Sequence, residues 1–219
     1  MYANDIKIGE WKRRKAKLRF VVASDGHYGQ PNTPYETYFD TLVKRNNEEH
    51  NKNPFSFCMI NGDIIHDDKK YFTGAKAALN KLQVKYYVSQ GNHGHVSVTE
   101  WEAIWALPVN HHFVIGKNTF LIATTTNENG TYLCPDIEWL TAQLKAHEQQ
   151  KNVFIFLHIN PGKLTTHAVN CEPLFELLAK HKNVRAIFNG HDHGEEGVKT
   201  KNNIPFIFNA HFGGNWGTT

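Results

Sequence analysis

The chain has 219 residues, of which 40% are hydrophobic, 12% aromatic and 21% charged, and its formal net charge is +3 at pH 7. This composition excludes a disordered or fibrous protein, and so small a charge excludes capture of a polyanion by the whole surface. The length supports one buried core, so we expect a single domain over residues 1–219.

The first feature along the chain is a basic cluster near the amino end. We interpret it as part of a solvated arm, residues 1–17, and nucleic acid, anionic lipid or an acidic protein is the less favoured partner. No apolar stretch of signal-peptide length follows it, and no segment reaches the length of a bilayer, so we expect a cytoplasmic protein without a membrane span. The cluster consists of Lys12, Arg13, Arg14, Lys15, Lys17 and Arg19.

Short apolar runs bounded by Gly, Pro, Asn or Asp alternate with stretches of helical spacing, which predicts an α/β architecture. The apolar runs predict strands over 18–23, 55–61, 85–89, 112–115, 119–124, 153–158, 184–189 and 206–210. The helical spacing predicts helices over 35–50, 71–82, 99–106, 135–148 and 173–181, and Pro135 suits a first-turn position. After the last strand the chain ends in Gly213 to Thr219, so we expect either that the natural chain continues or that a partner covers this edge.

The cysteines are three in number, Cys58, Cys134 and Cys171, and they show no paired spacing. This pattern predicts neither a disulfide framework nor a cysteine zinc site. A reducing compartment fits this expectation, in agreement with a cytoplasmic protein.

Potential metal ligands occur just where apolar strands are predicted to stop. In open α/β sheets, ligands bind at the carboxyl ends of the strands, so we expect these side chains to converge on one site. Carboxylates, an amide and imidazoles without thiolates suit Mn, Fe, Co, Ni or Zn better than Ca or Mg. Two adjacent cations of this kind can clamp a phosphoryl group and activate a bridging water. The predicted ligands are Asp25, His27, Asp63, Asn92, His158, His191 and His193.

These residues fall into five blocks that resemble the calcineurin-like metallophosphoesterases over residues 20–193. The blocks are Asp25-Gly-His27, Gly62-Asp63, Gly91-Asn92-His93, His158 and Gly190-His191-Asp-His193. The resemblance implies two mixed β-sheets packed face to face and flanked by helices, a four-layer αββα sandwich. It also implies that one cation binds Asp25, His27 and His193. The other would bind Asn92, His158 and His191, with Asp63 bridging the pair and His93 acting as a second-sphere acid.

The activity that the resemblance implies is hydrolysis of a phosphomonoester or phosphodiester by in-line attack of a metal-bridging hydroxide, with His93 assisting the leaving group. The implied cofactors are two divalent or mixed-valence transition metal ions, Mn, Fe or Zn, and the implied partner is a small-molecule phosphoester. We expect loops 30–35, 66–71, 94–98 and 160–169 to set the specificity. The sequence leaves the oligomeric state open.

One position departs from the family pattern. Members usually carry Asp or Glu directly after the histidine of the third block, where it can orient the imidazole, and this chain has Gly94. Either another carboxylate takes over or the activity is reduced, so a catalytically weak, metal-bound scaffold is the alternative function, and a nuclease is a third. For His66, Asp67 and Asp68 we favour a solvated turn over a place beside the site.

Overall fold

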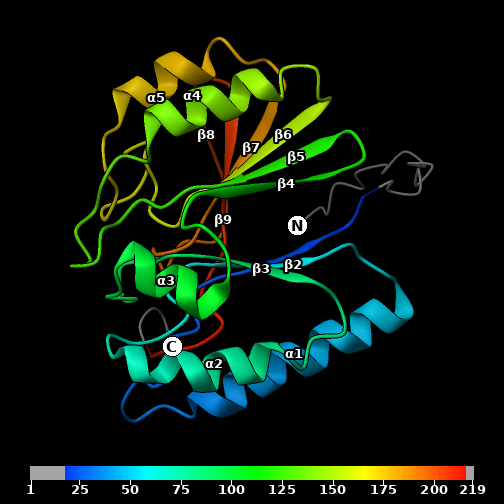
Figure 1. Cartoon of the computed structure of the whole chain (residues 1–219), viewed down its shortest axis with the longest axis vertical. Helices are drawn as coiled ribbons and strands as arrows, with labels where there is room; N and C mark the ends of the chain where they lie inside the picture. Colours follow the sequence, from blue (N-terminus) through cyan, green and yellow to red (C-terminus); the bar gives the residue numbers. More distant parts are fainter. Residues whose placement is uncertain (1–17, 216–219) are drawn as a thin grey trace, which may run out of the picture.

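The computed structural model of the chain describes residues 18–215 and shows two β-sheets between two outer layers of helices (Figure 1). The four-layer arrangement implied by the family resemblance is therefore confirmed. The expected arm, residues 1–17, lies outside the described residues, and so does all of the basic cluster except Arg19. Arg19 lies inside them and forms an ion pair of 2.6 Å with Glu49.

The first sheet contains three parallel strands in the order β1, β2, β3. Successive side chains of a strand point to opposite faces, so Met59 of β2 packs toward the other sheet while Cys58 and Ile60 pack toward the helices. The strands are β1 (Val21–Ala23), β2 (Cys58–Asn61) and β3 (Tyr86–Ser89). Its helical layer contains α1 (Tyr35–Lys52), η1 (Lys69–Tyr71), α2 (Phe72–Leu79) and α3 (Val98–Trp105).

The second sheet contains six strands in the order β4-β5-β6-β7-β9-β8. The pairs β5-β6, β6-β7 and β7-β9 are parallel. The edge strands β4 and β8 are antiparallel to their neighbours. The strands are β4 (His111–Ile115), β5 (Asn118–Ile122), β6 (Asn152–Phe156), β7 (Val184–Asn189), β8 (Gly197–Lys201) and β9 (Ile204–Phe208). Helices α4 (Ile137–Ala146) and α5 (Glu172–Leu178) pack on its outer face.

An aromatic layer fills the space between the two sheets. Phe57, Phe120 and Phe156 are fully buried there, and the ring of Phe20 stacks on Phe57 with 4.9 Å between centroids. Burying each such side chain contributes roughly 1.5–3 kcal/mol. This layer holds the sheets face to face and so fixes the relative position of the loops that follow their strands.

Strand β8 was not predicted, because it is polar and largely exposed and therefore shows no apolar run. Its turn to β9 consists of Asn202 and Asn203, which have φ of 52° and 63°, the left-handed conformations that a two-residue hairpin turn requires. Since β8 pairs with β9, the expectation of an uncovered edge at β9 is wrong within residues 18–215. Residues 216–219 lie outside the described part.

Helix α4 starts later than the sequence suggested. Asp136 is its N-cap and accepts a 2.9 Å hydrogen bond from the backbone N–H of Trp139, so Pro135 precedes the helix instead of occupying its first turn. The helix begins after Asp136 because its carboxylate accepts a backbone N–H of the first turn that would otherwise have no partner. None of the helices within the described residues is both long and apolar enough to cross a membrane.

The expectation of no disulfide is wrong. Cys134 and Cys171 form one, with their Cα atoms 5.5 Å apart, while Cys58 is free and buried. Cys134 lies between β5 and α4 and Cys171 lies between β6 and α5, so the fold brings together two loops that are distant in sequence. The argument from the cysteines for a reducing compartment therefore loses its basis.

Candidate metal centre

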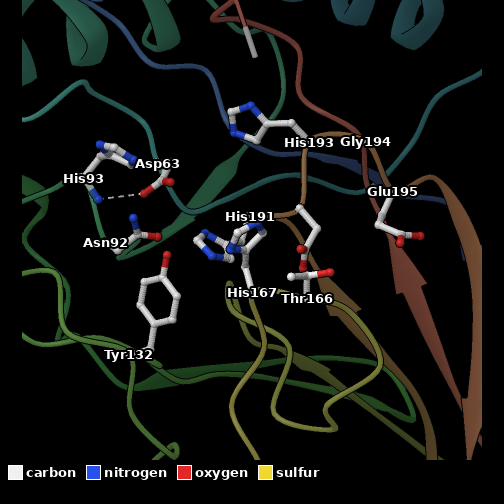
Figure 2. A pocket seen from close by; sticks show the side chains of 11 residues that line it. Asp63, Asn92, His93, Tyr132, Thr166, His167, His191, His193, Gly194 and Glu195 are labelled. Atoms are coloured by element: carbon white, nitrogen blue, oxygen red, sulfur yellow. Dashed lines mark hydrogen bonds between the residues drawn. The ribbon is translucent and has the colours of Figure 1, made fainter. Parts of the chain in front are cut away.

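All seven predicted ligands follow strands and meet at one end of the two sheets. Asp25 and His27 follow β1, Asp63 follows β2 and Asn92 follows β3 in the first sheet. His158 follows β6, and His191 and His193 follow β7, in the second sheet. Figure 2 shows Asp63, Asn92, His93, His191 and His193 around one pocket. The predicted convergence at the strand ends is thus present in the structure.

The loops approach one another more closely than a side chain at their glycines would allow. A Cβ placed on Gly91 would overlap the backbone nitrogen and carboxylate of Asp63. A Cβ on Gly190 would lie 2.6 Å from Asp25 Oδ2. Contacts this short do not occur between ordinary side chains, so glycine is required at both positions.

Several of the predicted ligands have a left-handed backbone, which residues other than glycine rarely adopt. The φ angles are 59° at Asp25, 44° at His27, 44° at Asp63 and 69° at His191. Such conformations cost on the order of 1–3 kcal/mol each and cluster at functional sites. The strain favours a functional over a purely structural role for this set of residues.

The first group of donors centres on Asp25. His193 Nε2 lies 3.1 Å from Asp25 Oδ1 and also 3.1 Å from His27 Nε2. The backbone N–H of His191 donates to Asp25 Oδ2 over 2.9 Å and fixes the carboxylate. One ligand atom from each of Asp25, His27 and His193 lies within 4.8 Å of the other two, a spacing that a single cation can span.

The second group centres on Asp63. Asp63 Oδ2 lies 3.0 Å from His158 Nε2 and 3.9 Å from His27 Nε2, so this oxygen lies between the two groups. The other oxygen, Oδ1, accepts the backbone N–H of His93 over 2.9 Å. Asp63, His158 and His191 also place one ligand atom each within 4.8 Å.

Asn92 Oδ1 and His191 Nε2 are buried near the second group, and neither has a hydrogen-bond partner within residues 18–215. Leaving a buried polar atom unpaired costs about 1–3 kcal/mol, so such atoms usually mark a ligand or a strained site. An amide oxygen and an imidazole nitrogen are both ordinary ligands of transition metals, so these residues fit a bound cation.

Burial and mutual charge set the protonation states of the site. Burial raises the pKa of Asp63, but the charge of nearby histidines, first of all His158, lowers it well below its usual value. The carboxylates in turn overcome the effect of burial on His158 and raise its pKa to about 9. Burial lowers the pKa of His27 to about 3 and that of His191 to about 4. Ionised carboxylates and neutral imidazoles are the forms that bind cations, so His27 and His191 are ready to bind one, whereas His158 must release its proton when it does.

His93 lines the pocket beside Asp63, and its imidazole is hydrogen-bonded to a carboxylate. Its Nδ1 lies 2.6 Å from Oδ1 of Asp67, in the loop after β2. Burial raises the pKa of Asp67, but this hydrogen bond and the charge of His93 lower it below the usual value. A solvated turn was expected for Asp67, and half of its side chain is exposed, but the expectation is wrong in that Asp67 contacts His93 beside the site. His66 also lies here, with its ring stacked on that of His93.

The pocket has a volume of about 460 Å³ and continues from the candidate ligands over two further loops (Figure 2). Tyr132 precedes α4, and its ring centroid lies 4.8 Å from that of His191. His167 lies 6.2 Å from His191 on the opposite loop, within the 160–169 segment that we expected to shape specificity. Tyr132 was missed, because no motif marks a single tyrosine in a loop. The ring of His211 also lies beside the site and stacks on that of His193, with 4.9 Å between centroids.

Comparison with known proteins gives a family match and several similar folds. The family model described as calcineurin-like phosphoesterase matches residues 18–195. No curated protein matches the chain.

Among solved structures, a dimetal phosphatase from Danio rerio is 15% identical, with 89% of this chain and 88% of that one covered and a TM-score of 0.72. A calcineurin-like phosphoesterase from Bacillus subtilis is 14% identical, with coverages of 89% and 81% and a TM-score of 0.52. A 5'-nucleotidase from Candida albicans is 14% identical with a TM-score of 0.58, and the match covers 88% of this chain but only 45% of that enzyme. These likenesses show a shared fold.

Proposed function

Since the chain belongs to the calcineurin-like phosphoesterase family of metal-dependent phosphoesterases, we propose that it hydrolyses a small-molecule phosphomonoester or phosphodiester at a dinuclear metal site. The observation that carries this proposal is the convergence of carboxylates and imidazoles from five strand-end loops on one site. A pocket of about 460 Å³ is of the size that encloses small molecules.

The two groups of donors suggest the distribution of ligands. One cation would be held by Asp25, His27 and His193. The other would be held by Asn92, His158 and His191, and Asp63 would contact both, because its Oδ2 lies between His158 and His27. This donor set favours Mn, Fe or Zn. When bound, two such ions activate a water molecule as nucleophile and stabilise negative charge on the phosphoryl oxygens.

The residues around the ions complete the chemistry. Backbone N–H groups of His93 and His191 hold the carboxylates of Asp63 and Asp25, so the ligands are oriented before any ion arrives. His93 is the pocket imidazole placed to give a proton to the leaving-group oxygen. Tyr132 and His167 lie where the leaving group would extend, so we propose that they contact it.

The experiment removes metal from the protein with EDTA, reloads it with Mn²⁺, Fe²⁺ or Zn²⁺, and measures hydrolysis of an aryl phosphate and a bis-aryl phosphodiester. We expect two ions per chain by elemental analysis and activity toward at least one substrate. Asp63→Asn should lose bound metal and activity. Asp68→Asn should keep the metal and the activity, because the carboxylate of Asp68 caps η1 and pairs with Lys70. A protein that binds metal but leaves a broad panel of phosphoesters intact would instead support the scaffold alternative.

A further inference from the structure

His93 can act on a leaving group only if its ring is held in one orientation and one tautomer. The backbone at His93 is fixed, because its N–H donates to Asp63 Oδ1 and its carbonyl accepts the backbone N–H of Asp67 over 3.0 Å. The ring itself requires a partner at Nδ1 if Nε2 is to be the nitrogen that acts on a leaving group.

The neighbouring residue does not supply that partner, since position 94 is glycine. A Cβ added to Gly94 would meet Gly91 O at 3.4 Å and side-chain atoms of Gln90 and Phe72 at 3.8 Å, which are ordinary contacts. There is thus space for a β-carbon at this position. The loop after β2 supplies a carboxylate instead.

We propose that Asp67 is the positioning residue of His93, an inference that rests on the proposed function. Its Oδ1 lies 2.6 Å from His93 Nδ1, and its backbone N–H holds the carbonyl of the same histidine. These two bonds and the bond from His93 to Asp63 Oδ1 link the loop after β2 to the loop after β3. The same Asp67 oxygen lies 3.4 Å from His95 Nε2, so a second imidazole approaches the carboxylate.

Because Asp67 is hydrogen-bonded to Nδ1, the two ring nitrogens of His93 have different roles. Nδ1–H donates to Asp67 throughout, and Nε2–H gives its proton to the leaving oxygen as that oxygen takes the electron pair of the breaking P–O bond. His93 is then the neutral Nδ1–H tautomer, still bonded to Asp67, and regains its proton from solvent. Without the carboxylate the ring can turn and the other tautomer can form, so proton transfer is lost while substrate binding is retained.

Asp67→Asn is a well-matched test. The backbone of Asp67 has φ of 60°, and Asn tolerates that conformation about as well as Asp. We expect kcat to fall about tenfold to a hundredfold with little change in KM or in metal content. The fall should be larger for an alkyl phosphate than for p-nitrophenyl phosphate, because a good leaving group needs little protonation.

Two further variants separate positioning from a structural effect. Adding Gly94→Asp to Asp67→Asn should restore part of the lost kcat, since it supplies a carboxylate beside His93. The control Asp68→Asn should retain wild-type kcat and KM. An equal loss for good and poor leaving groups, or no loss at all, would overturn the role of Asp67.

A spectroscopic readout keeps this test independent of the proposed function. In metal-free protein at one fixed pH, ¹⁵N spectra of the imidazoles should show a proton on Nδ1 of His93, with the signal assigned by its absence in His93→Gln. Asp67→Gly removes the side chain without backbone strain and should replace that signal by a mixture of tautomers. An inactive wild type with this spectral change would defeat the proposed function alone, and an active wild type with an unchanged spectrum would defeat the inference about Asp67 alone.

Discussion

His158 Nε2 lies 3.0 Å from Asp63 Oδ2, although the two residues follow strands of different sheets. Asp63 follows the end of β2 in the three-stranded sheet, and His158 follows the end of β6 in the six-stranded sheet. The site therefore exists only while the sheets stay packed face to face. The aromatic layer between them supports the chemistry as well as the fold.

Truncation of this layer should destabilise the whole protein. Phe120 is fully buried, with its ring 4.8 Å from those of Phe57 and Phe113. Phe120→Ala leaves a cavity and should lower the free energy of unfolding of the metal-free protein by about 3–5 kcal/mol, as measured by urea denaturation. Val198→Ala, at an exposed position of β8, should change it by less than about 0.5 kcal/mol. Similar effects of the two substitutions would contradict the assigned core.

The glycines beside the carboxylates should be required for metal binding. Gly190→Ala would place a methyl group against the Ser24 hydroxyl and 2.6 Å from Asp25 Oδ2, so we expect loss of at least one ion per chain by elemental analysis. Gly94→Ala meets only ordinary contacts and should keep both ions. Full metal content in Gly190→Ala would show that the β7 loop does not hold Asp25 as described.

The metal-free protein should be most stable near pH 6.5. Burial lowers the pKa of His27 to about 3 and of His191 to about 4, so below about pH 6.5 the unfolded chain takes up protons that the folded chain excludes. We expect a loss on the order of 2–3 kcal/mol between pH 6.5 and 5. For His158, Asp63 and Asp25 outweigh burial and raise the pKa to about 9, so its stabilisation is complete below pH 6.5 and is lost as the pH rises through 9.

Urea midpoints of EDTA-treated protein at pH 5, 6.5 and 9 check this dependence. His191→Gln removes one titrating group and should lose less stability than the wild type between pH 6.5 and 5. Stability that stays flat from pH 5 to 9 would contradict the assigned burial and charge of these histidines.

The disulfide should matter for both stability and substrate binding. Tyr132 is two residues before Cys134, and His167 is four residues before Cys171, so the bond ties together two loops that line the pocket. Cys171→Ser or reduction should lower stability by roughly 2–4 kcal/mol. It should also raise KM more than it lowers kcat, because Tyr132 and His167 line the pocket but are not candidate metal ligands. A reductant should have no further effect on Cys134→Ser, and unchanged KM and stability on reduction would argue against the tether.

The convergence of the candidate metal ligands could be predicted from sequence because each lies within a few residues of a strand whose apolar run is visible. Parallel strands of one sheet share their carboxyl ends, so the strand pattern brings Asp63 and Asn92 to one edge, whereas the position of His158 near Asp63 follows from the face-to-face sheets that the family resemblance implies. The bond from Asp67 to His93 could not be predicted in this way. It depends on a left-handed backbone at Asp67 and on the relative position of two loops, and neither leaves a periodic signal.

The disulfide and strand β8 escaped prediction for related reasons. The spacing of Cys134 and Cys171 along the chain does not reveal that their loops are neighbours. The β8 segment is an exposed edge with few apolar residues, and its best signal was the Asn202–Asn203 pair, which is typical of a tight hairpin turn.

Anomalous diffraction from crystals of the Mn²⁺-loaded protein would test the dinuclear site most directly. We predict two peaks in one pocket, one contacted by Asp25, His27 and His193 and the other by Asn92, His158 and His191, with the Asp63 carboxylate touching both. Peaks elsewhere, or no peak in this pocket under saturating metal, would contradict the proposed site.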